Sequence, residues 1–242
     1  MKREKKISSD EAIDLIKEDP LRYAGQRLST VPVGTAGIWR VSRFTVSPTE
    51  ALVQRLRVVD GLGARAPREG EYTVLSYRTG EERKGKPVYL PMMSDTQAEM
   101  ADHIPAIKNC AGNVLVTGLG LGVITDALML RWEVRSVTVI EKDPDVIKLV
   151  ADHLVKLHHA STKPLRILCA DAFTWETDQK FDTAWHDIWP TLKPESLPEM
   201  RKLRKRYPTV WTGCWSEPQA KAMAAFDRNP SHETALRAIS GF

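Results

Sequence analysis

The sequence has few cysteines, no long apolar run and little excess charge, and each absence excludes a class of protein. Its 242 residues hold three cysteines, an odd number without the spacing of a zinc site or a disulfide framework. No stretch approaches the roughly 20 apolar residues that cross a bilayer, and the charged start lacks the pattern of a signal peptide. A formal net charge of +4 is too small to argue for nucleic acid. We therefore expect a soluble, cytoplasmic protein with reduced thiols, no membrane contact and no nucleic-acid partner.

Strand-like and helix-like segments alternate over the second half of the chain, which predicts a parallel sheet with crossover helices. The expected strands are 113–117, 136–140, 165–169, 181–186 and 209–212, and the expected helices are 121–131, 144–158, 194–206 and 217–227. Shorter β-prone runs precede them at 38–46, 52–59, 72–77 and 87–90, after a short helix at 8–18 and before another at 94–108. The fold class is thus α/β, a Rossmann-like doubly wound, mainly parallel sheet with a small N-terminal antiparallel β unit. We place the domain boundary between 1–92 and 93–242.

A glycine turn follows the first of the expected parallel strands. Gly118, Gly120 and Gly122 stand at alternate positions, where glycine lets the backbone approach a ligand closely. The helix that follows offers unpaired N–H groups at its start. The dinucleotide fingerprint G-x-G-x-x-G fails because residue 123 is valine, and no Gly-Lys-Ser/Thr follows to make a Walker loop.

Acidic residues end the next strands. Glu141, Asp171 and Asp187 close the second, third and fourth expected strands. The carboxyl ends of parallel strands meet at one edge of the sheet, so we expect one ligand crevice there. Glu141 lies about 20 residues past the glycine turn, where an acid accepts hydrogen bonds from ribose hydroxyls. The pattern predicts a nucleoside ligand.

This order of motifs resembles the class I S-adenosylmethionine-dependent methyltransferases, and more narrowly their spermidine synthase-like branch. The narrower resemblance is carried by Glu99-Met-Ala-Asp-His-Ile-Pro105, Glu141-Lys-Asp-Pro144, Asp171-Ala172, Asp187 and the β-rich unit before the domain. It covers about residues 90–215. The resemblance implies S-adenosylmethionine as cofactor and a methyl transfer to a small-molecule acceptor with an amine or hydroxyl group.

The resemblance also assigns roles to single residues. The glycines would lie against the amino-acid part of the cofactor, Glu141 would hold the ribose, and Asp171 would accept a hydrogen bond from the adenine. The cofactor-binding residues it implies are Gly118, Leu119, Gly120, Gly122, Glu141, Lys142, Asp171, Ala172 and Asp187. Asp187 is also the expected catalytic residue, which orients or deprotonates the acceptor. The expected substrate-binding residues are Gln97, Glu99, His186 and Trp189.

Four positions depart from the polyamine-synthesising branch, and all concern amine binding. They are Gln97, Ala98, Leu121 and Pro190, where the branch has a tyrosine, a polar residue and two acids. A neutral residue at 121 suits the methionine-like tail of S-adenosylmethionine. Two alternatives stay open: an aminopropyltransferase that uses decarboxylated S-adenosylmethionine, and a nucleoside-binding interaction protein without turnover.

Three further features of the sequence have structural explanations. Asp95, Glu99, Asp102 and His103 are close in sequence, but methyl transfer needs no metal and we expect none. The basic stretch 201–206 is typical of a helix end. The β unit is of a kind that often forms subunit contacts, so a homodimer is compatible with the sequence, whereas the identity of the acceptor is not readable from it.

Overall fold

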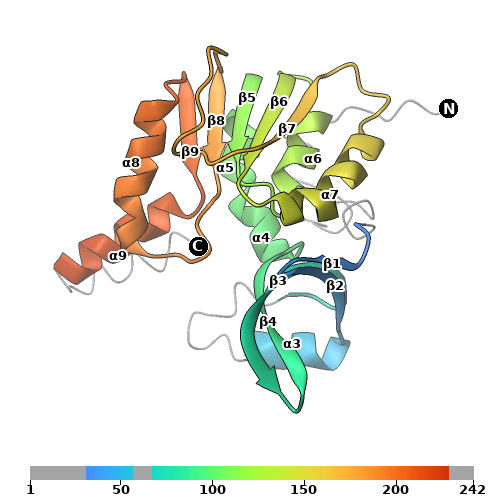
Figure 1. Ribbon diagram of the computed structural model, residues 1–242. Coiled ribbons are helices and arrows are strands. Elements are labelled where there is room, and N and C mark those ends of the chain that lie inside the picture. Colours follow the sequence, from blue (N-terminus) through green and yellow to red (C-terminus); the bar gives the residue numbers. More distant parts are fainter. Residues whose placement is uncertain (1–30, 57–66, 229–242) are drawn as a thin grey trace.

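The computed structural model describes residues 31–56 and 67–228, which form two sheets with helices around them (Figure 1). The larger sheet is parallel, with the strand order β7-β6-β5-β8-β9. Its strands are β5 (Gly112–Thr117), β6 (Val134–Glu141), β7 (Leu165–Cys169), β8 (Thr183–His186) and β9 (Trp211–Cys214). The chain runs outward from β5 to β7 and then returns to the other side of β5 for β8. The strand order therefore reverses between β5 and β8, which confirms the predicted doubly wound sheet.

Helices cover both faces of the parallel sheet because its central strand is apolar on both. Val114 and Val116 of β5 belong to one buried cluster, and Leu115 between them belongs to another. The first cluster is closed by α5 (Ile104–Asn109), α6 (Val123–Leu130) and α7 (Pro144–Leu157), and the second by α8 (Leu197–Arg206). The short 3₁₀ turn η3 (Pro194–Ser196) leads into α8, and α9 (Glu217–Arg228) follows β9.

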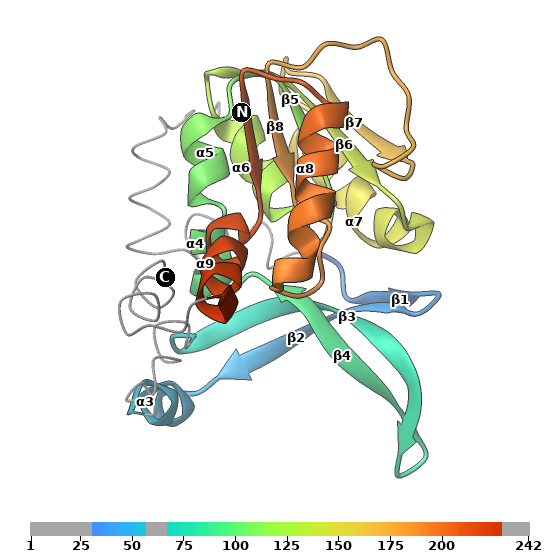
Figure 2. The ribbon, with the colours of Figure 1, turned by 90° about the vertical axis from the view of Figure 1, so that its left-hand side faces the viewer.

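The smaller sheet is antiparallel, with the order β1-β2-β3-β4, and confirms the predicted N-terminal β unit. Its strands are β1 (Gly34–Ala36), β2 (Trp39–Val46), β3 (Gly70–Arg83) and β4 (Lys86–Ser94). Figure 2 shows this sheet beneath the parallel one, with the tip of the β3–β4 hairpin extending away from the body of the molecule. Buried side chains from both sheets, including Val41 and Leu75 of the smaller one, pack in one cluster with β5 and β6.

The prediction of a strand at 52–59 is wrong over the residues that the structure describes. The chain there forms the helix α3 (Pro48–Leu56). Ser47 and Glu50 make a capping box, in which the Glu50 carboxylate accepts a hydrogen bond from the Ser47 N–H at 2.8 Å and the Ser47 hydroxyl accepts one from the Glu50 N–H at 3.2 Å. The Ser-x-x-Glu signal at 47–50 was therefore more informative than the β-branched residues that follow it.

The predicted helix at 94–108 is two short helices, α4 (Gln97–Asp102) and α5. Thr96 is the N-cap residue of α4, and Asp95 before it accepts a hydrogen bond from the Thr73 N–H at 2.7 Å, which ties β3 to the start of α4. The predicted helix at 8–18 and the residues 57–59 lie outside the described ranges. Within those ranges, no helix combines the length and apolar character that a bilayer crossing requires.

Candidate functional site

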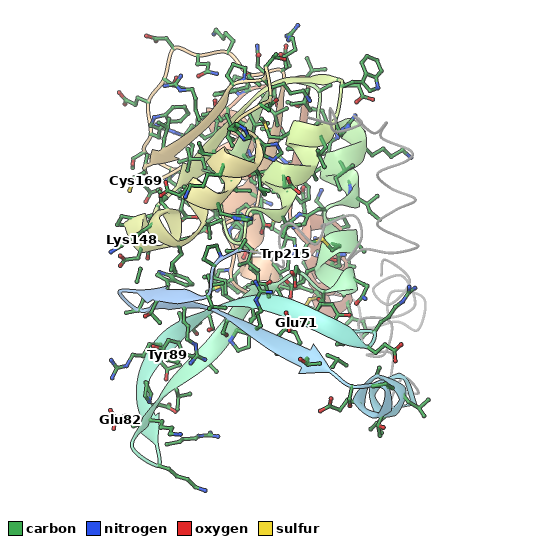
Figure 3. All side chains as sticks on the ribbon, turned by 90° about the vertical axis from the view of Figure 1, so that its right-hand side faces the viewer. Glu71, Glu82, Tyr89, Lys148, Cys169 and Trp215 are labelled. Carbon is green, nitrogen blue, oxygen red and sulfur yellow. The ribbon has the colours of Figure 1, made fainter. Side chains whose placement is uncertain are left out.

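A cavity of about 740 Å³ opens at the carboxyl edge of the parallel sheet, where the strand order reverses. Its walls come from the glycine turn after β5, the ends of β6 and β7, the segment after β8, helix α4 and the antiparallel sheet. Figure 3 labels Trp215, which follows β9 and reaches this region between the two sheets. The predicted residues that line the cavity are Gly118, Leu119, Gly120, Glu141, Lys142, Asp171, Ala172, Glu99, Asp187 and Trp189. The structure thus brings most of the sequence-derived set together.

The glycine turn has a backbone conformation that other residues rarely adopt. Gly118, Gly120 and Gly122 have φ values of +93°, +50° and +76°. A Cβ atom on Gly118 would overlap the backbone carbonyl oxygen of Asp187, directly after the neighbouring strand β8, and one on Gly120 would overlap the side chain of Met93. Gly122 packs against Leu154 of α7 and is not among the residues that line the cavity. Two of the three glycines therefore shape the cavity, and the third lets α6 pack on α7.

Glu141 lies at the end of β6, and its carboxylate holds the backbone around the cavity. One oxygen accepts a hydrogen bond from the Leu119 N–H at 2.8 Å, and the other accepts one from the Asp143 N–H at 2.9 Å. Each carboxylate oxygen has a second lone pair and can accept a further hydrogen bond from a ligand. Glu141 therefore joins the glycine turn to the next strand and still faces the cavity as an acceptor.

Asp171 and Lys142 form an ion pair at the far rim of the cavity. The Lys142 Nζ lies 3.1 Å from one Asp171 oxygen, and the other oxygen accepts a hydrogen bond from the Phe173 N–H at 2.8 Å. That backbone hydrogen bond, and then Lys142, lower the pKa of Asp171 below its usual value, so it is a carboxylate at neutral pH. Ala172 is buried beside it and contributes apolar wall.

Asp187 lies where β8 ends, next to the glycine turn. Its backbone N–H donates to the Thr117 carbonyl at 2.8 Å, which extends the β5–β8 ladder by one residue. Burial raises the pKa of its carboxyl to about 7, with a further contribution from the nearby carboxylates of Glu99 and Asp102. A carboxyl group with a pKa near neutrality is suited to accept and release a proton.

Two predicted substrate-binding residues do not reach the cavity. Gln97 instead exchanges hydrogen bonds with the Tyr72 hydroxyl, at 3.0 Å and 2.8 Å. His186 is fully buried within the sheet, with Nδ1 3.0 Å from the Thr117 hydroxyl, and burial lowers its pKa to about 3. Strand alternation turns His186 to the opposite face from Asp187.

The antiparallel sheet supplies part of the cavity wall that the sequence did not indicate. Trp39, Leu75, Met92 and Met93 line it from strands β2, β3 and β4. The Trp39 indole donates a hydrogen bond to the Asp143 carboxylate at 2.6 Å, which attaches β2 to the start of α7. No sequence signal connects these strands to the parallel sheet, since the contact depends on how the two sheets are placed in space.

His103 and Glu199 complete the wall. His103, between α4 and α5, is buried, which lowers its pKa to about 4, so it is a neutral imidazole at physiological pH. Glu199 of α8 accepts a hydrogen bond from the Trp189 indole at 2.8 Å and thereby orients that ring at the rim. The Glu99-to-Pro105 motif contained His103, but its position in the wall follows from the break between α4 and α5.

A second hollow of about 820 Å³ lies between α4, α5 and the edge strand β9. None of the sequence-predicted site residues is among those that line it. Over the described residues, no group of three or more histidine, cysteine, aspartate or glutamate side chains is arranged to hold a metal ion. The cavity at the strand ends is thus the candidate site.

The chain was also compared with known proteins. It matches no protein-family model and no curated protein. Solved structures with partial similarity include a dimethyladenosine transferase from Plasmodium falciparum, 24% identical with a TM-score of 0.35 over 46% of this chain and 38% of that one. A putative methyltransferase from Thermoplasma acidophilum is 17% identical, with a TM-score of 0.36 over 64% and 58% of the two chains. A putative caffeoyl-CoA O-methyltransferase from Staphylococcus aureus is 14% identical, with a TM-score of 0.37 over 58% and 66%.

These similarities are confined to part of each structure. The match spans 38% of the length of the first of these chains and 58% of the second. The evidence for the function of this chain is the set of residues that line its own cavity.

Proposed function

We propose that this protein is an S-adenosylmethionine-dependent methyltransferase that acts on an amine or hydroxyl group of a small molecule. The observation that carries this proposal is the meeting of four elements in one cavity: the glycine turn, Glu141, Asp171 and Asp187. Each comes from a different segment of the chain, and each has the chemistry that one part of this cofactor requires.

The residues present fit the cofactor. Glu141 has free lone pairs for the two ribose hydroxyls, Asp171 is a carboxylate suited to an exocyclic amine, and Ala172 and Phe173 offer apolar surface for a base. Because Gly118 and Gly120 lack a Cβ atom, the Asp187 carbonyl and the Met93 sulfur can lie directly against the turn. When bound, the cofactor supplies a methyl group on a positively charged sulfur, which needs no further activation.

The protein then has to position the acceptor and to remove one proton from it. Asp187 lies in the cavity wall beside Gly118, and its carboxyl has a pKa near 7. We assign to it the orientation of the acceptor and the acceptance of the proton that leaves the nitrogen or oxygen. The Trp189 ring, held by Glu199, and the apolar residues around it wall off this end from water.

An aminopropyltransferase would need acids around a cationic cofactor tail. The glycine turn offers the neutral, buried Leu121 at the position where the polyamine-synthesising branch has an acid. Glu99 does line the cavity, but its carboxylate accepts hydrogen bonds from the backbone and hydroxyl of Ser94, at 2.5 Å and 2.8 Å. The turn therefore favours a cofactor whose tail keeps its carboxylate.

Isothermal titration of the purified protein with S-adenosylmethionine tests this proposal directly. We expect binding by the wild-type protein and a loss of affinity of about tenfold or more in Glu141→Gln, because a charge-assisted hydrogen bond to ribose is replaced by a neutral one. Glu81→Gln, at an exposed position of the β3–β4 hairpin, is the matched control and should bind like the wild type. Absence of binding to the wild-type protein would refute the proposal.

Turnover is tested separately from binding. Formation of S-adenosylhomocysteine with a panel of small amines and alcohols would support methyl transfer. Preference for decarboxylated S-adenosylmethionine, with formation of methylthioadenosine in the presence of a diamine, would support the aminopropyltransferase. Tight binding without consumption of either compound would favour the non-catalytic alternative.

A further inference from the structure

Strand β4 contains an irregularity next to the cavity. Leu75 pairs with Met93 and Ser76 pairs with Pro91, so one step along β3 corresponds to two steps along β4, and Met92 is the additional residue. Consecutive residues of a regular strand point to opposite faces, yet Met92 and Met93 both line the cavity. A β-bulge that re-aims a side chain in this way is a recurring feature beside functional sites.

The bulge places the Met93 side chain directly on the glycine turn. Its Sδ accepts a hydrogen bond from the Leu121 backbone N–H at 3.0 Å, and the same sulfur fills the space where a Cβ atom of Gly120 would be. This contact joins the antiparallel sheet to the turn between β5 and α6. A side chain from outside the parallel sheet thus takes one of the N–H groups of the glycine turn before α6.

The chemistry of that N–H group is the basis of the inference. Backbone N–H groups in a glycine turn before a helix are preferred positions for anionic groups, and a carboxylate is a much stronger acceptor than a thioether. Met93 is a neutral, weak acceptor on a flexible side chain with three rotatable bonds. A carboxylate can therefore replace the Met93 sulfur as the acceptor of the Leu121 N–H.

We propose that Met93 is a specificity-determining residue of the cofactor site, whose thioether covers the part of the glycine turn that a carboxylate-bearing tail must reach. This inference rests on the proposed function. A nucleoside without such a tail occupies the Glu141 and Asp171 end and leaves Met93 in place. S-adenosylmethionine displaces Met93 from the Leu121 N–H, and the lost contact reduces its apparent affinity.

Binding of two ligands to two variants tests this inference. The ligands are S-adenosylmethionine and 5′-methylthioadenosine, which share the nucleoside and the sulfur but differ in the amino-acid tail. We expect Met93→Ala to bind S-adenosylmethionine about tenfold more tightly than the wild type, since a hydrogen bond no longer has to be broken. Its affinity for methylthioadenosine should change by no more than about twofold, and Met92→Ala, the neighbouring cavity residue, should leave the ratio of the two affinities unchanged.

The opposite results would overturn the inference. If Met93→Ala weakens S-adenosylmethionine, or changes both ligands equally, Met93 is a wall residue and does not compete for the turn. If the wild type binds S-adenosylmethionine and the ratio is the same in both variants, the proposed function stands and this inference fails. If neither ligand binds the wild type, both fail.

A measurement on the wild-type protein reports on Met93 without removing its side chain. With methyl-¹³C methionine labelling, the Met93 resonance, assigned by its absence in Met93→Leu, should shift strongly on saturation with S-adenosylmethionine and weakly with methylthioadenosine. An unchanged Met93 resonance at saturating S-adenosylmethionine would exclude the displacement.

Discussion

At the scale of single residues, Asp187 carries an electrostatic cost that depends on pH. Its carboxyl has a pKa of about 7 in the folded protein because it is buried near Glu99 and Asp102, whereas an aspartate in the unfolded chain has a pKa near 3.9. The folded state therefore holds more protons than the unfolded state between these two values, and this group lowers stability as pH rises through that window. The cost is complete above about pH 7 and absent below about pH 4.

Asp187→Asn should therefore stabilise the protein at pH 8 more than at pH 5. We expect the gain in the free energy of unfolding to be about 2 kcal/mol larger at pH 8, measured by urea denaturation at both pH values. Asp178→Asn, the same substitution at an exposed position, is the matched control. An equal effect of Asp187→Asn at pH 5 and pH 8 would show that its carboxyl has an ordinary pKa.

Gly118 is required for two separable reasons, its backbone angle and the space beside it. Gly80 in the β3–β4 hairpin has a similar φ of +86°, but a Cβ atom there would meet nothing within 4 Å. Gly80→Ala should cost about 1 kcal/mol, from the left-handed backbone alone. Gly118→Ala should cost about 3 kcal/mol or more, because its Cβ atom would also overlap the Asp187 carbonyl. Equal losses, measured by thermal unfolding, would mean that β8 moves aside without cost.

At the scale of elements, the contact between β2 and α7 holds the antiparallel sheet over the cavity. Asp143 caps α7 by accepting a hydrogen bond from the Asp145 N–H, and its second oxygen accepts one from the Trp39 indole. One carboxylate thus serves both the helix start and the attachment of the other sheet. The capping role was visible in Asp143-Pro144, but the partner at residue 39, 104 positions earlier, was not.

Trp39→Phe removes this indole donor and keeps an aromatic ring. We expect a loss of about 1 kcal/mol in the free energy of unfolding, and a coupling energy of similar size with Asp143→Ala in a double-mutant cycle. Trp132→Phe, at a tryptophan that is 66% exposed, should have little effect and serves as control. A coupling energy near zero would show that the two elements are held together by apolar packing alone.

At the scale of the whole molecule, the two sheets share one buried cluster. Leu75 of β3 is 1% exposed and belongs to the same cluster as β5, β6, α6 and α7. The boundary proposed between residues 92 and 93 stays a prediction. A shared core nevertheless favours unfolding of both parts in one transition.

Leu75→Ala should lower the stability of the whole protein by about 3 kcal/mol. Of the seven tryptophans, only Trp39 precedes residue 93, so fluorescence reports mainly on the parallel-sheet part. We expect the fluorescence and far-ultraviolet circular dichroism transitions to shift together in this variant. Leu90→Ala, at a residue 45% exposed in the same β unit, should shift neither appreciably. Separate transitions for the two probes would show that the parts unfold independently.

The local signals were sufficient for the parallel sheet. The expected strands 113–117 and 136–140 agree with β5 and β6 to within two residues, because buried apolar side chains occupy both faces of these strands. The expected strand 165–169 matches β7, an edge strand that is only partly buried. The α3 segment was misassigned, since its β-branched residues weighed more in the prediction than the capping box before them. The helix at 94–108 was predicted as continuous, although Pro105, which lies in the first turn of α5, is a residue that interrupts a helix.

The sequence by itself determined the glycine turn and the acids at the strand ends, because residues such as Gly118, Glu141 and Asp171 are placed by the local pattern of strands and turns. Only the tertiary structure decided that Gln97 and His186 face away from the cavity, that Trp39 and Met93 face into it, and that burial raises the pKa of Asp187. The physical reason is that backbone conformation and strand alternation are local properties. Desolvation and contact between two sheets depend on residues far apart in the chain.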